Sequence, residues 1–367
     1  TVVPGYTYRF SHESVGHPFK ITIGSIVETV SSGESIDIQI PTDQINNGSY
    51  VCTSHSSMTN TITISDEANV LDSIEGNLKL WLDASNIDGG SNSTLTDGAS
   101  MSEWIDLSGS GHNASQSTAA NQPVLSGQAI VFDGSNDHMT LPSDTMSVGN
   151  TDYEFIVVVK SHEDHGGGFY HAGDSSNNQA NGLRYSTSYG VYNYWWNNDL
   201  NNPGVITLNE LQLVNFSYDT DSGRMIYVDG ELGVEDTASN RGTTTATNYL
   251  GFANGTYLDG EISEVLIFDQ ALTSDERAKV NYYLSKKWGL ETRIDSDGDG
   301  YSDDLEESLG TSPIDQSDVP YVDLSDTVDT QIGESSGLDE IESNIRLWLD
   351  VSNIDGGSNS TLTDGGS

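Results

Sequence analysis

Two segments of this sequence are nearly the same. Residues 344–367 match residues 77–100 at 20 of 24 positions. A repeat at that distance predicts a unit that is laid down head to tail, so that each copy folds much like the one before. Arrays of this kind usually span distance or present surfaces. The repeat therefore predicts a modular chain whose partners are copies of itself or neighbouring repeats.

Acidic residues far outnumber basic ones. The chain has 56 Asp and Glu against 13 Lys and Arg, a net charge of −43 at pH 7. Such a chain repels phosphate backbones and anionic lipid headgroups, so we expect cations as partners and no nucleic acid. The sequence contains no run of about 18 apolar residues, so we expect no membrane insertion. The one cysteine, Cys52, excludes an internal disulfide framework.

Residues 1–66 are typical of a small antiparallel β-domain. Short alternating stretches of apolar and polar residues are separated by Gly, Ser, Pro and Asn. A thiol, two imidazoles and a thioether stand in the connecting segments, and this mixture of soft sulfur and nitrogen favours copper. With this ligand set the segment resembles the cupredoxins, a family of small β-sandwiches. The resemblance implies a copper site made of His17, Cys52, His55 and Met58.

Two interpretations of this segment stay open. If copper binds, the domain is either an electron carrier or a domain in which the metal only stabilises the ligand loop. If copper does not bind, the same residues are a free cysteine, two loop histidines and a buried methionine. The second interpretation makes the domain purely structural.

Residues 70–290 hold the largest expected core. Alternating strands at short spacing, with Asp-Gly and Gly-Ser turns, predict two packed antiparallel sheets that form a jelly roll. The dipeptide Asp229-Gly230 predicts a two-residue hairpin. One helix follows, with Ser274 as its expected cap. Four residues are spaced to dock this helix on a sheet: Val280, Tyr283, Leu284 and Trp288.

This region resembles the laminin-G-like and concanavalin-A-like jelly rolls of large secreted proteins. The residues that carry the resemblance are Trp81-Leu-Asp83, Trp104-x-Asp106, Phe132-Asp133-Gly134 and Gly260-Glu-Ile-Ser-Glu264. The resemblance implies the fold, whereas such folds include lectins, adhesins, spacers and some glycosidases. Retaining glycosidases need two carboxylates about 5 Å apart. Because Glu261 and Glu264 would point to opposite faces of a strand, we expect no enzymatic activity.

An aromatic run at residues 185–196 offers a binding surface. Aromatic faces beside amide groups suit sugars, which present apolar C–H faces and hydroxyls. We expect glycan contacts from Tyr189, Trp195 and Trp196. The alternative is that every second residue, such as Tyr192 and Tyr194, belongs to the core while the others cover the sheet.

Residues 291–318 carry the most specific motif. The segment 295–306 reproduces the twelve-residue EF-hand pattern, with oxygen donors at alternating positions, a turn glycine at the sixth and a final glutamate. The predicted Ca²⁺ ligands are Asp295, Asp297, Asp299, Tyr301 through its carbonyl, Asp303 and Glu306. The residues that follow resemble the calcium repeats of thrombospondin type 3 stalks. We expect calcium to convert a self-repelling acidic tether into a stiff joint.

The remaining residues complete a modular organisation. Residues 319–343 form an acidic linker, and residues 344–367 begin a second jelly-roll repeat. Together the sequence predicts a mainly β, non-enzymatic extracellular protein, structural or adhesive, from a cell surface, a filament or a virion fibre. The alternatives are a glycan-binding lectin-like module and a copper-binding electron carrier.

Overall fold

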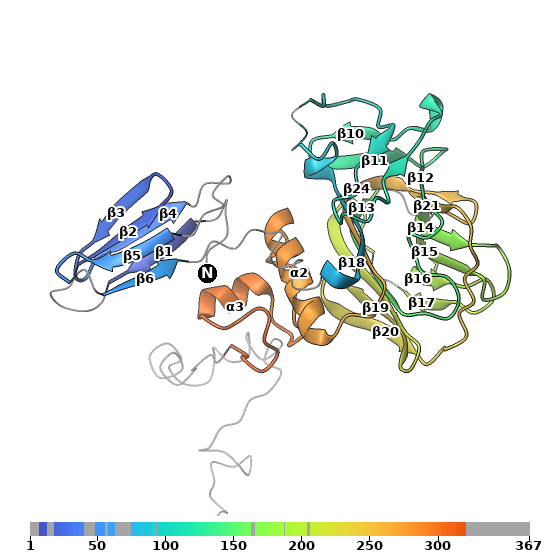
Figure 1. Ribbon diagram of the computed structural model, residues 1–367. Coiled ribbons are helices and arrows are strands. Elements are labelled where there is room, and N and C mark those ends of the chain that lie inside the picture. The colour runs from blue at the N-terminus through green and yellow to red at the C-terminus, as the bar shows by residue number, and fades with distance from the viewer. Residues whose placement is uncertain are drawn as a thin grey trace, which may run out of the picture. The chain divides into compact units, whose positions relative to one another are not determined.

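The computed structural model describes residues 7–12, 18–39, 48–55, 58–62 and 75–320, apart from 91, 93, 163–165, 187 and 204–205. Within these residues the protein is mainly β, with antiparallel sheets and few helices (Figure 1). None of the described helices is both long and apolar enough to cross a membrane. His17, the linker beyond residue 320 and the repeat at 344–367 lie outside the described residues.

The N-terminal domain consists of two small antiparallel sheets. One pairs β1 with β4, and the other has the order β3-β2-β5-β6. The strands are β1 (Thr7–Ser11), β2 (Phe19–Ile23), β3 (Ile26–Val30), β4 (Ser35–Gln39), β5 (Gly48–Cys52) and β6 (Thr59–Ile62). The core is a cluster of branched aliphatic residues that includes Ile21, Ile23 and Ile38. The sequence analysis did not anticipate β3, which pairs with β2 through a tight turn.

The central domain is a jelly roll of two eight-stranded sheets. The sheet that carries the helix, here the helix-side sheet, contains β7 (Leu78–Asp83), β10 (Val124–Ser126), β11 (Ala129–Asp133), β13 (Tyr153–Ser161), β18 (Leu211–Asp219), β19 (Gly223–Val228), β20 (Glu231–Asp236) and β24 (Asp259–Phe268). The other, here the outer sheet, contains β8 (Glu103–Trp104), β9 (Ala114–Ser115), β12 (Met139–Leu141), β14 (Gly167–Gly173), β15 (Ala180–Ser186), β16 (Gly190–Tyr194), β17 (Leu200–Asn202) and β21 (Asn248–Leu250). The prediction of two antiparallel sheets is confirmed.

The strand β13 shows how the layers are built. Phe155 and Val157 contribute to the core between the two sheets, whereas Ile156 and Val158 belong to a second core beneath the helix. A strand that is buried on both faces needs an unbroken apolar run, which the sequence Phe-Ile-Val-Val-Val supplies. The domain therefore has three layers, the outer sheet, the helix-side sheet and α2, as Figure 1 shows.

The helix α2 spans Ser274–Trp288 and packs on the helix-side sheet. Val280, Tyr283 and Leu284 are buried in the core beneath it, which confirms the predicted docking face. Its N-cap is Thr273, one residue earlier than predicted, because the Thr273 hydroxyl and the Glu276 side chain form a reciprocal capping box. Gly289 ends the helix in the left-handed conformation.

The connector that follows α2 packs on the jelly roll. The short helix α3 spans Asp303–Leu309, and Ile294 before it is fully buried in the core under α2. The predicted Asp229-Gly230 hairpin is present between β19 and β20, with both residues at positive φ. A side chain at Gly230 would lie 1.7 Å from the carbonyl oxygen of Asp295. Gly230 therefore lets the connector lie directly against this turn.

Candidate functional site

The loop from Asp295 to Glu306 closes around the first of its aspartates. Asp295 Oδ1 accepts hydrogen bonds from the backbone N–H groups of Gly298 and Asp299, and its Oδ2 accepts one from Gly300 at 2.7 Å. Gly298 and Gly300 have φ of 79° and 101°, a region that glycine enters without steric cost. The two glycines thus let the chain double back, so that acidic side chains from consecutive residues meet.

Four carboxylate oxygens of this loop have no partner. Asp297 and Asp299 each use Oδ1 to accept a backbone N–H from two residues further on. Their Oδ2 atoms, and both oxygens of Glu306, are shielded from solvent without a hydrogen-bond donor. Carboxylate oxygens of Asp295, Asp297 and Asp299 lie within 4.8 Å of one another. Shielded polar oxygens without donors are costly, and either a proton or a cation would lower that cost.

The pKa values of two acids in this loop are raised by burial and by repulsion from neighbouring carboxylates. Burial, followed by repulsion from Asp297 and Asp299, raises the pKa of Glu306 to about 8. Burial and the charge of Asp299 likewise raise the pKa of Asp297 to about 6. These carboxylates hold protons at a pH where ordinary carboxylates are ionised, because like charges face the same space.

The residues present fit a hard divalent cation. Carboxylate oxygens are the ligands that Ca²⁺ prefers, and the structure gathers Asp295, Asp297 and Asp299 as the sequence pattern predicted. Asp303 has other partners, because its two oxygens accept from Ser296 N and Ser296 Oγ, each at 2.9 Å. Asp303 thereby ties the start of α3 to the start of the loop. For Tyr301, the structure shows its backbone N–H donating to Asp299.

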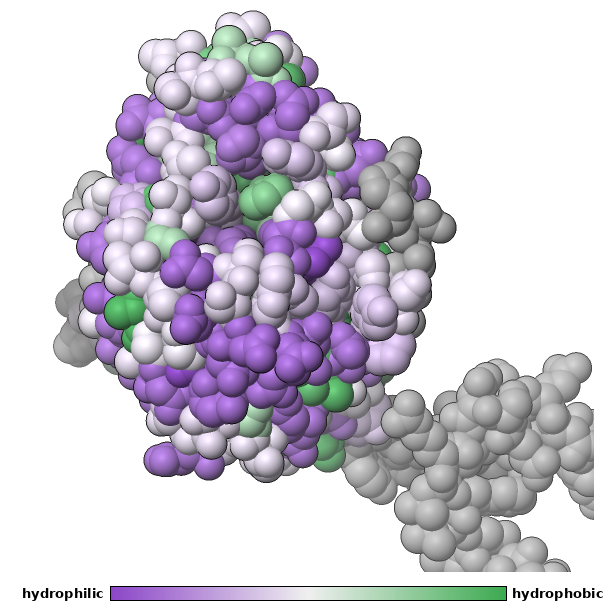
Figure 2. All heavy atoms as spheres, turned by 90° about the vertical axis from the view of Figure 1, so that its right-hand side faces the viewer, coloured by the Kyte–Doolittle hydropathy of each residue, from purple (hydrophilic) through white to green (hydrophobic). Residues whose placement is uncertain are grey.

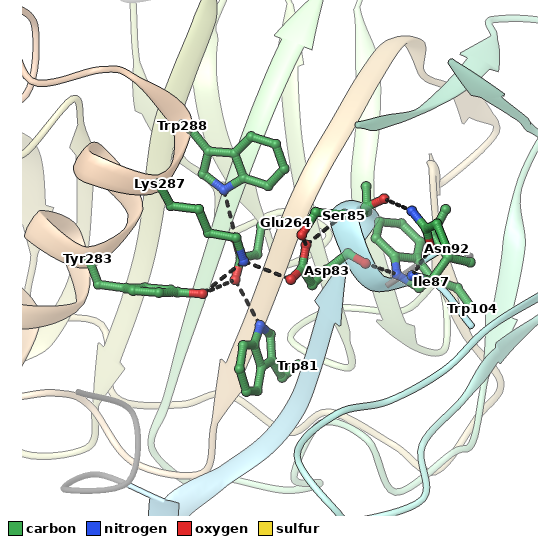
Figure 3. Close-up of polar contacts among 11 residues, drawn as sticks. Trp81, Asp83, Ser85, Ile87, Asn92, Trp104, Glu264, Tyr283, Lys287 and Trp288 are labelled. Carbon is green, nitrogen blue, oxygen red and sulfur yellow. Dashed lines mark hydrogen bonds and ion pairs between the residues drawn. The ribbon is translucent and has the colours of Figure 1, made fainter. Parts of the chain in front are cut away.

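A second group of buried acids lies between β7, β24 and α2 (Figure 3). Glu264 is fully buried, and Lys287 lies 2.9 Å from its Oε2. Four further contacts surround the two carboxylates, namely Trp81 Nε1 and Tyr283 Oη on Glu264 Oε1, Trp288 Nε1 on Glu264 Oε2, and Lys287 Nζ on Asp83 Oδ2 at 2.7 Å. Two carboxylates share one lysine in this cluster, and with the indole and phenol donors they hold α2 on the sheet.

The sequence analysis did not find this cluster. Its members come from distant positions, so no local spacing brings them together. Trp81 and Asp83 were noted only as markers of the fold resemblance. A signal was nevertheless present, because both residues recur as Trp348 and Asp350 in the repeated segment.

The structure corrects the prediction for the aromatic run. Trp195 is 0% exposed and its Nε1 donates to Asn181 inside the core, so its face is not available to a sugar. The alternative assigned Tyr192 and Tyr194 to the core; Tyr192 is indeed buried, at 6% exposure, whereas Tyr194 is partly exposed. Val191 and Trp195 point into the core between the sheets, and the alternation of a strand therefore places Tyr192 and Tyr194 on the opposite, outer face.

The outer face carries several aromatic side chains. Tyr189 is 55% exposed, and Trp196 is partly exposed with its ring 5.7 Å from that of Tyr194. The hairpin of β22 (Phe252–Ala253) and β23 (Thr256–Tyr257) lies over Gly168 of the outer sheet, because a side chain there would lie 2.0 Å from Ala253 N. Figure 2 shows the side on which β14 to β17 lie, where pale residues of intermediate hydropathy separate strongly hydrophilic areas.

Arg184 is the outer-face residue that the sequence analysis missed. Its guanidinium lies over the rings of Tyr192 and Tyr194, at 5.3 and 5.7 Å from their centres. A charged residue in a strand is usually only a solvated position, so the sequence pattern gave no reason to single it out. The structure shows it held by aromatic faces.

The predicted copper ligands are partly described. Cys52 Sγ lies 3.7 Å from His55 Nδ1, and Cys52 is 6% exposed. Met58 is 55% exposed, which differs from the buried methionine considered above. His17 lies outside the described residues. Copper binding stays a prediction, which blue absorption after Cu(II) addition, lost in Cys52→Ala, would test.

Comparison with known proteins supports the fold of the central domain. Residues 133–276, less than half of the chain, match a family described as the concanavalin A-like lectin/glucanases superfamily. That description covers both binding proteins and enzymes. No curated protein matches the sequence.

Solved structures with related folds are distant. A Trypanosoma rangeli sialidase in complex with sialic acid matches at 12% identity and a TM-score of 0.43, over 77% of this chain and 53% of the sialidase. Domain 4 of AbnA, a GH43 extracellular arabinanase from Geobacillus stearothermophilus, in complex with arabinotriose, matches at 18% identity and a TM-score of 0.37, over 56% of this chain and 98% of that domain. The chain thus spans about half the length of the sialidase. Because these TM-scores lie below 0.5, nothing about function follows from them.

Proposed function

We propose that this chain is a calcium-stabilised, non-catalytic module of an extracellular structural or adhesive protein. The observation that carries the proposal is the set of four shielded carboxylate oxygens on Asp297, Asp299 and Glu306, which have no donor. Oxygen-only sites of this type in extracellular modules bind Ca²⁺ with a Kd of about 10⁻⁴–10⁻³ M. Such an affinity suits the calcium concentrations found outside cells.

The ion would stiffen the exit from the jelly roll. The connector is already attached by contacts outside the set of unpartnered oxygens, such as buried Ile294 and the Asp303–Ser296 hydrogen bonds. Bound calcium would neutralise the facing acids and fix the loop between α2 and α3. The earlier expectation of a slack tether is thereby refined, since the loop is a docked joint that calcium stabilises.

Thermal unfolding of the full chain tests this proposal. Calcium at about 10 times its Kd, roughly 1–10 mM, should stabilise the folded state by about 1.4 kcal/mol, and Mg²⁺ should do less. Glu306→Gln should lose the calcium response. Asp304→Asn is the matched control, because Asp304 is an exposed acid two residues away. An unchanged melting temperature in millimolar calcium would refute the proposal.

Glycan binding on the outer face is a second candidate function. The partly exposed rings of Tyr194 and Trp196 beside Arg184 favour it, and the matched family includes lectins. Aromatic faces of this kind stack on sugar rings. A glycan array with the full chain tests it, and Trp196→Ala should reduce any binding. Binding to no glycan would leave the spacer role alone.

A further inference from the structure

One cationic side chain on the outer face has no acidic partner. Arg184 lies in β15, directly opposite Tyr192 of β16. Its Nη2 donates to Thr256 Oγ1 in the β22–β23 hairpin, and the rings of Tyr192 and Tyr194 hold the guanidinium on its other side. Among the residues that the structure describes, no carboxylate forms an ion pair with Arg184.

This is unusual in so acidic a chain. With 56 acids and 13 basic residues, a basic side chain readily finds a carboxylate. Three other arginines do so, namely Arg224 with Asp236, Arg277 with Glu154, and Arg293 with Glu210 and Asp229. Arg184 is partly exposed, and within the described part of the chain its contacts are two rings and a hydroxyl. Arg241 likewise has no ion pair there, but it is buried and donates to Thr243, Ser147 and Thr151.

The guanidinium of Arg184 has N–H groups for which the described residues supply no acceptor. Its Nε is shielded from solvent and has no acceptor, and no described residue accepts a hydrogen bond from its Nη1. A shielded donor without an acceptor costs free energy. The donor that a ligand can reach is Nη1, because Nη2 already donates to Thr256 and Nε is shielded. A carboxylate accepts a strong, charge-assisted hydrogen bond from such a donor.

The net charge of −43 does not prevent an anion from binding here. At physiological salt the Debye length is about 8 Å. Whether an anion binds at Arg184 therefore depends on the charged groups close to it. The nearby acid Asp199 is engaged, since its Oδ1 accepts from the backbone N–H of Trp195 at 3.1 Å. Arg184 is the cation at this surface, and the charge of nearby Asp199 offsets part of it.

We propose that Arg184 binds the carboxylate of an acidic sugar, such as a uronate or a sialate, while Tyr194 and Trp196 contact the sugar ring. This inference rests on the proposed glycan-binding function and narrows it to one ligand class. It makes Arg184 the residue that distinguishes acidic from neutral glycans.

The test compares matched ligands on the full chain by calorimetry or saturation-transfer NMR. The probes are a glucuronate oligosaccharide, sialyllactose, and the neutral carboxyl-reduced form of the first. The variants are Arg184→Gln, Arg184→Lys and the control Lys279→Gln, which removes an exposed charge from α2. Melting temperatures verify that each variant is folded, and Arg184→Lys keeps the charge if Arg184→Gln fails to fold.

Acidic ligands should bind the unaltered chain and Lys279→Gln at least about tenfold more tightly than the neutral form. Arg184→Gln should lower acidic binding to the neutral level, and Arg184→Lys should keep part of the preference. The relative strength of the uronate and sialate arms identifies the sugar. Equal binding of acidic and neutral probes would overturn the role of Arg184 and leave glycan binding intact. Binding to no probe would overturn both.

Discussion

Two regions of this molecule bury carboxylates, and they balance the charge differently. In the cluster between β7, β24 and α2, Glu264 and Asp83 share Lys287, and indole and phenol donors fill the remaining positions on Glu264. In the loop from Asp295 to Glu306, four shielded carboxylate oxygens have no hydrogen-bond donor among the described residues. The same residue types therefore make a structural clamp in one region and a candidate ion site in the other.

Burial raises the pKa of Glu264 in the cluster, but there the charge of Lys287 opposes the rise. Although burial opposes it, the charges of Glu264 and Asp83 raise the pKa of Lys287, so the lysine stays charged between them. In the loop the acids have only one another nearby, and burial and mutual repulsion raise the pKa of Glu306 to about 8. In one region a lysine lies between the buried acids, whereas in the other the described acids face one another.

The largest effect should come from removing the internal cation. Lys287→Met leaves Glu264 and Asp83 buried without a counter-charge, and breaking such a pair costs about 3–5 kcal/mol. Urea unfolding in saturating calcium measures this cost.

Lys79→Met is the control for that variant. Lys79 pairs with Asp269 at 3.0 Å but is 38% exposed, so its loss should cost about 0–1 kcal/mol. Equal, small costs for both variants would show that the cluster around Glu264 does not clamp α2.

The second effect is a dependence of stability on pH that calcium reverses. In the presence of a chelator, the folded state holds the Glu306 proton up to a pH of about 8, whereas the group's ordinary pKa is 4.5. The folded state therefore binds more protons between these values, and stability should fall as the pH rises through this window. Urea midpoints across this window measure the fall.

Two comparisons sharpen this prediction. Calcium should stabilise the chain most above pH 8, where the ligands are ionised. Glu306→Gln removes the titrating group, so the slope in chelator should flatten in this variant. A stability in chelator that rises across the same window would contradict the unpartnered state of Glu306.

The smallest effect should distinguish two acids within the loop. Asp303 is satisfied by Ser296, as the acids of the clamp are satisfied by their partners, whereas Glu306 has no donor. Asp303→Asn should weaken calcium binding by less than about tenfold, and Glu306→Gln by more than about tenfold. Calcium titrations of both variants measure these losses of affinity. Equal losses would make Asp303 a direct ligand, as the EF-hand pattern predicted.

Local and distant features differed in how far the sequence predicted them. The calcium loop is contiguous, so the spacing of its acids was enough to place Asp295, Asp297 and Asp299 together. The clamp was not predictable in this way, because Asp83, Glu264 and Lys287 meet only after β7, β24 and α2 have packed. Alternation predicted the sheets and the docking face of α2 for the same local reason.

The prediction for the aromatic run at residues 185–196 was wrong for a different reason. Both alternating sets of residues in this run contain aromatic side chains, so hydropathy could not decide which set faces the core. The register of β16 also shifts between Gly190 and Val191, and Trp196 stands at a φ of 58°. Tertiary packing buried Trp195 and left Tyr194 and Trp196 beside Arg184.

A calorimetric titration of the full chain with Ca²⁺ tests the central claim most directly. The unaltered chain, freed of calcium by a chelator and dialysed, should bind one ion in the loop 295–306, and Glu306→Gln should lose that binding. No heat of binding up to millimolar calcium, or the same binding in Glu306→Gln, would contradict the claim that these unpartnered oxygens form an ion site.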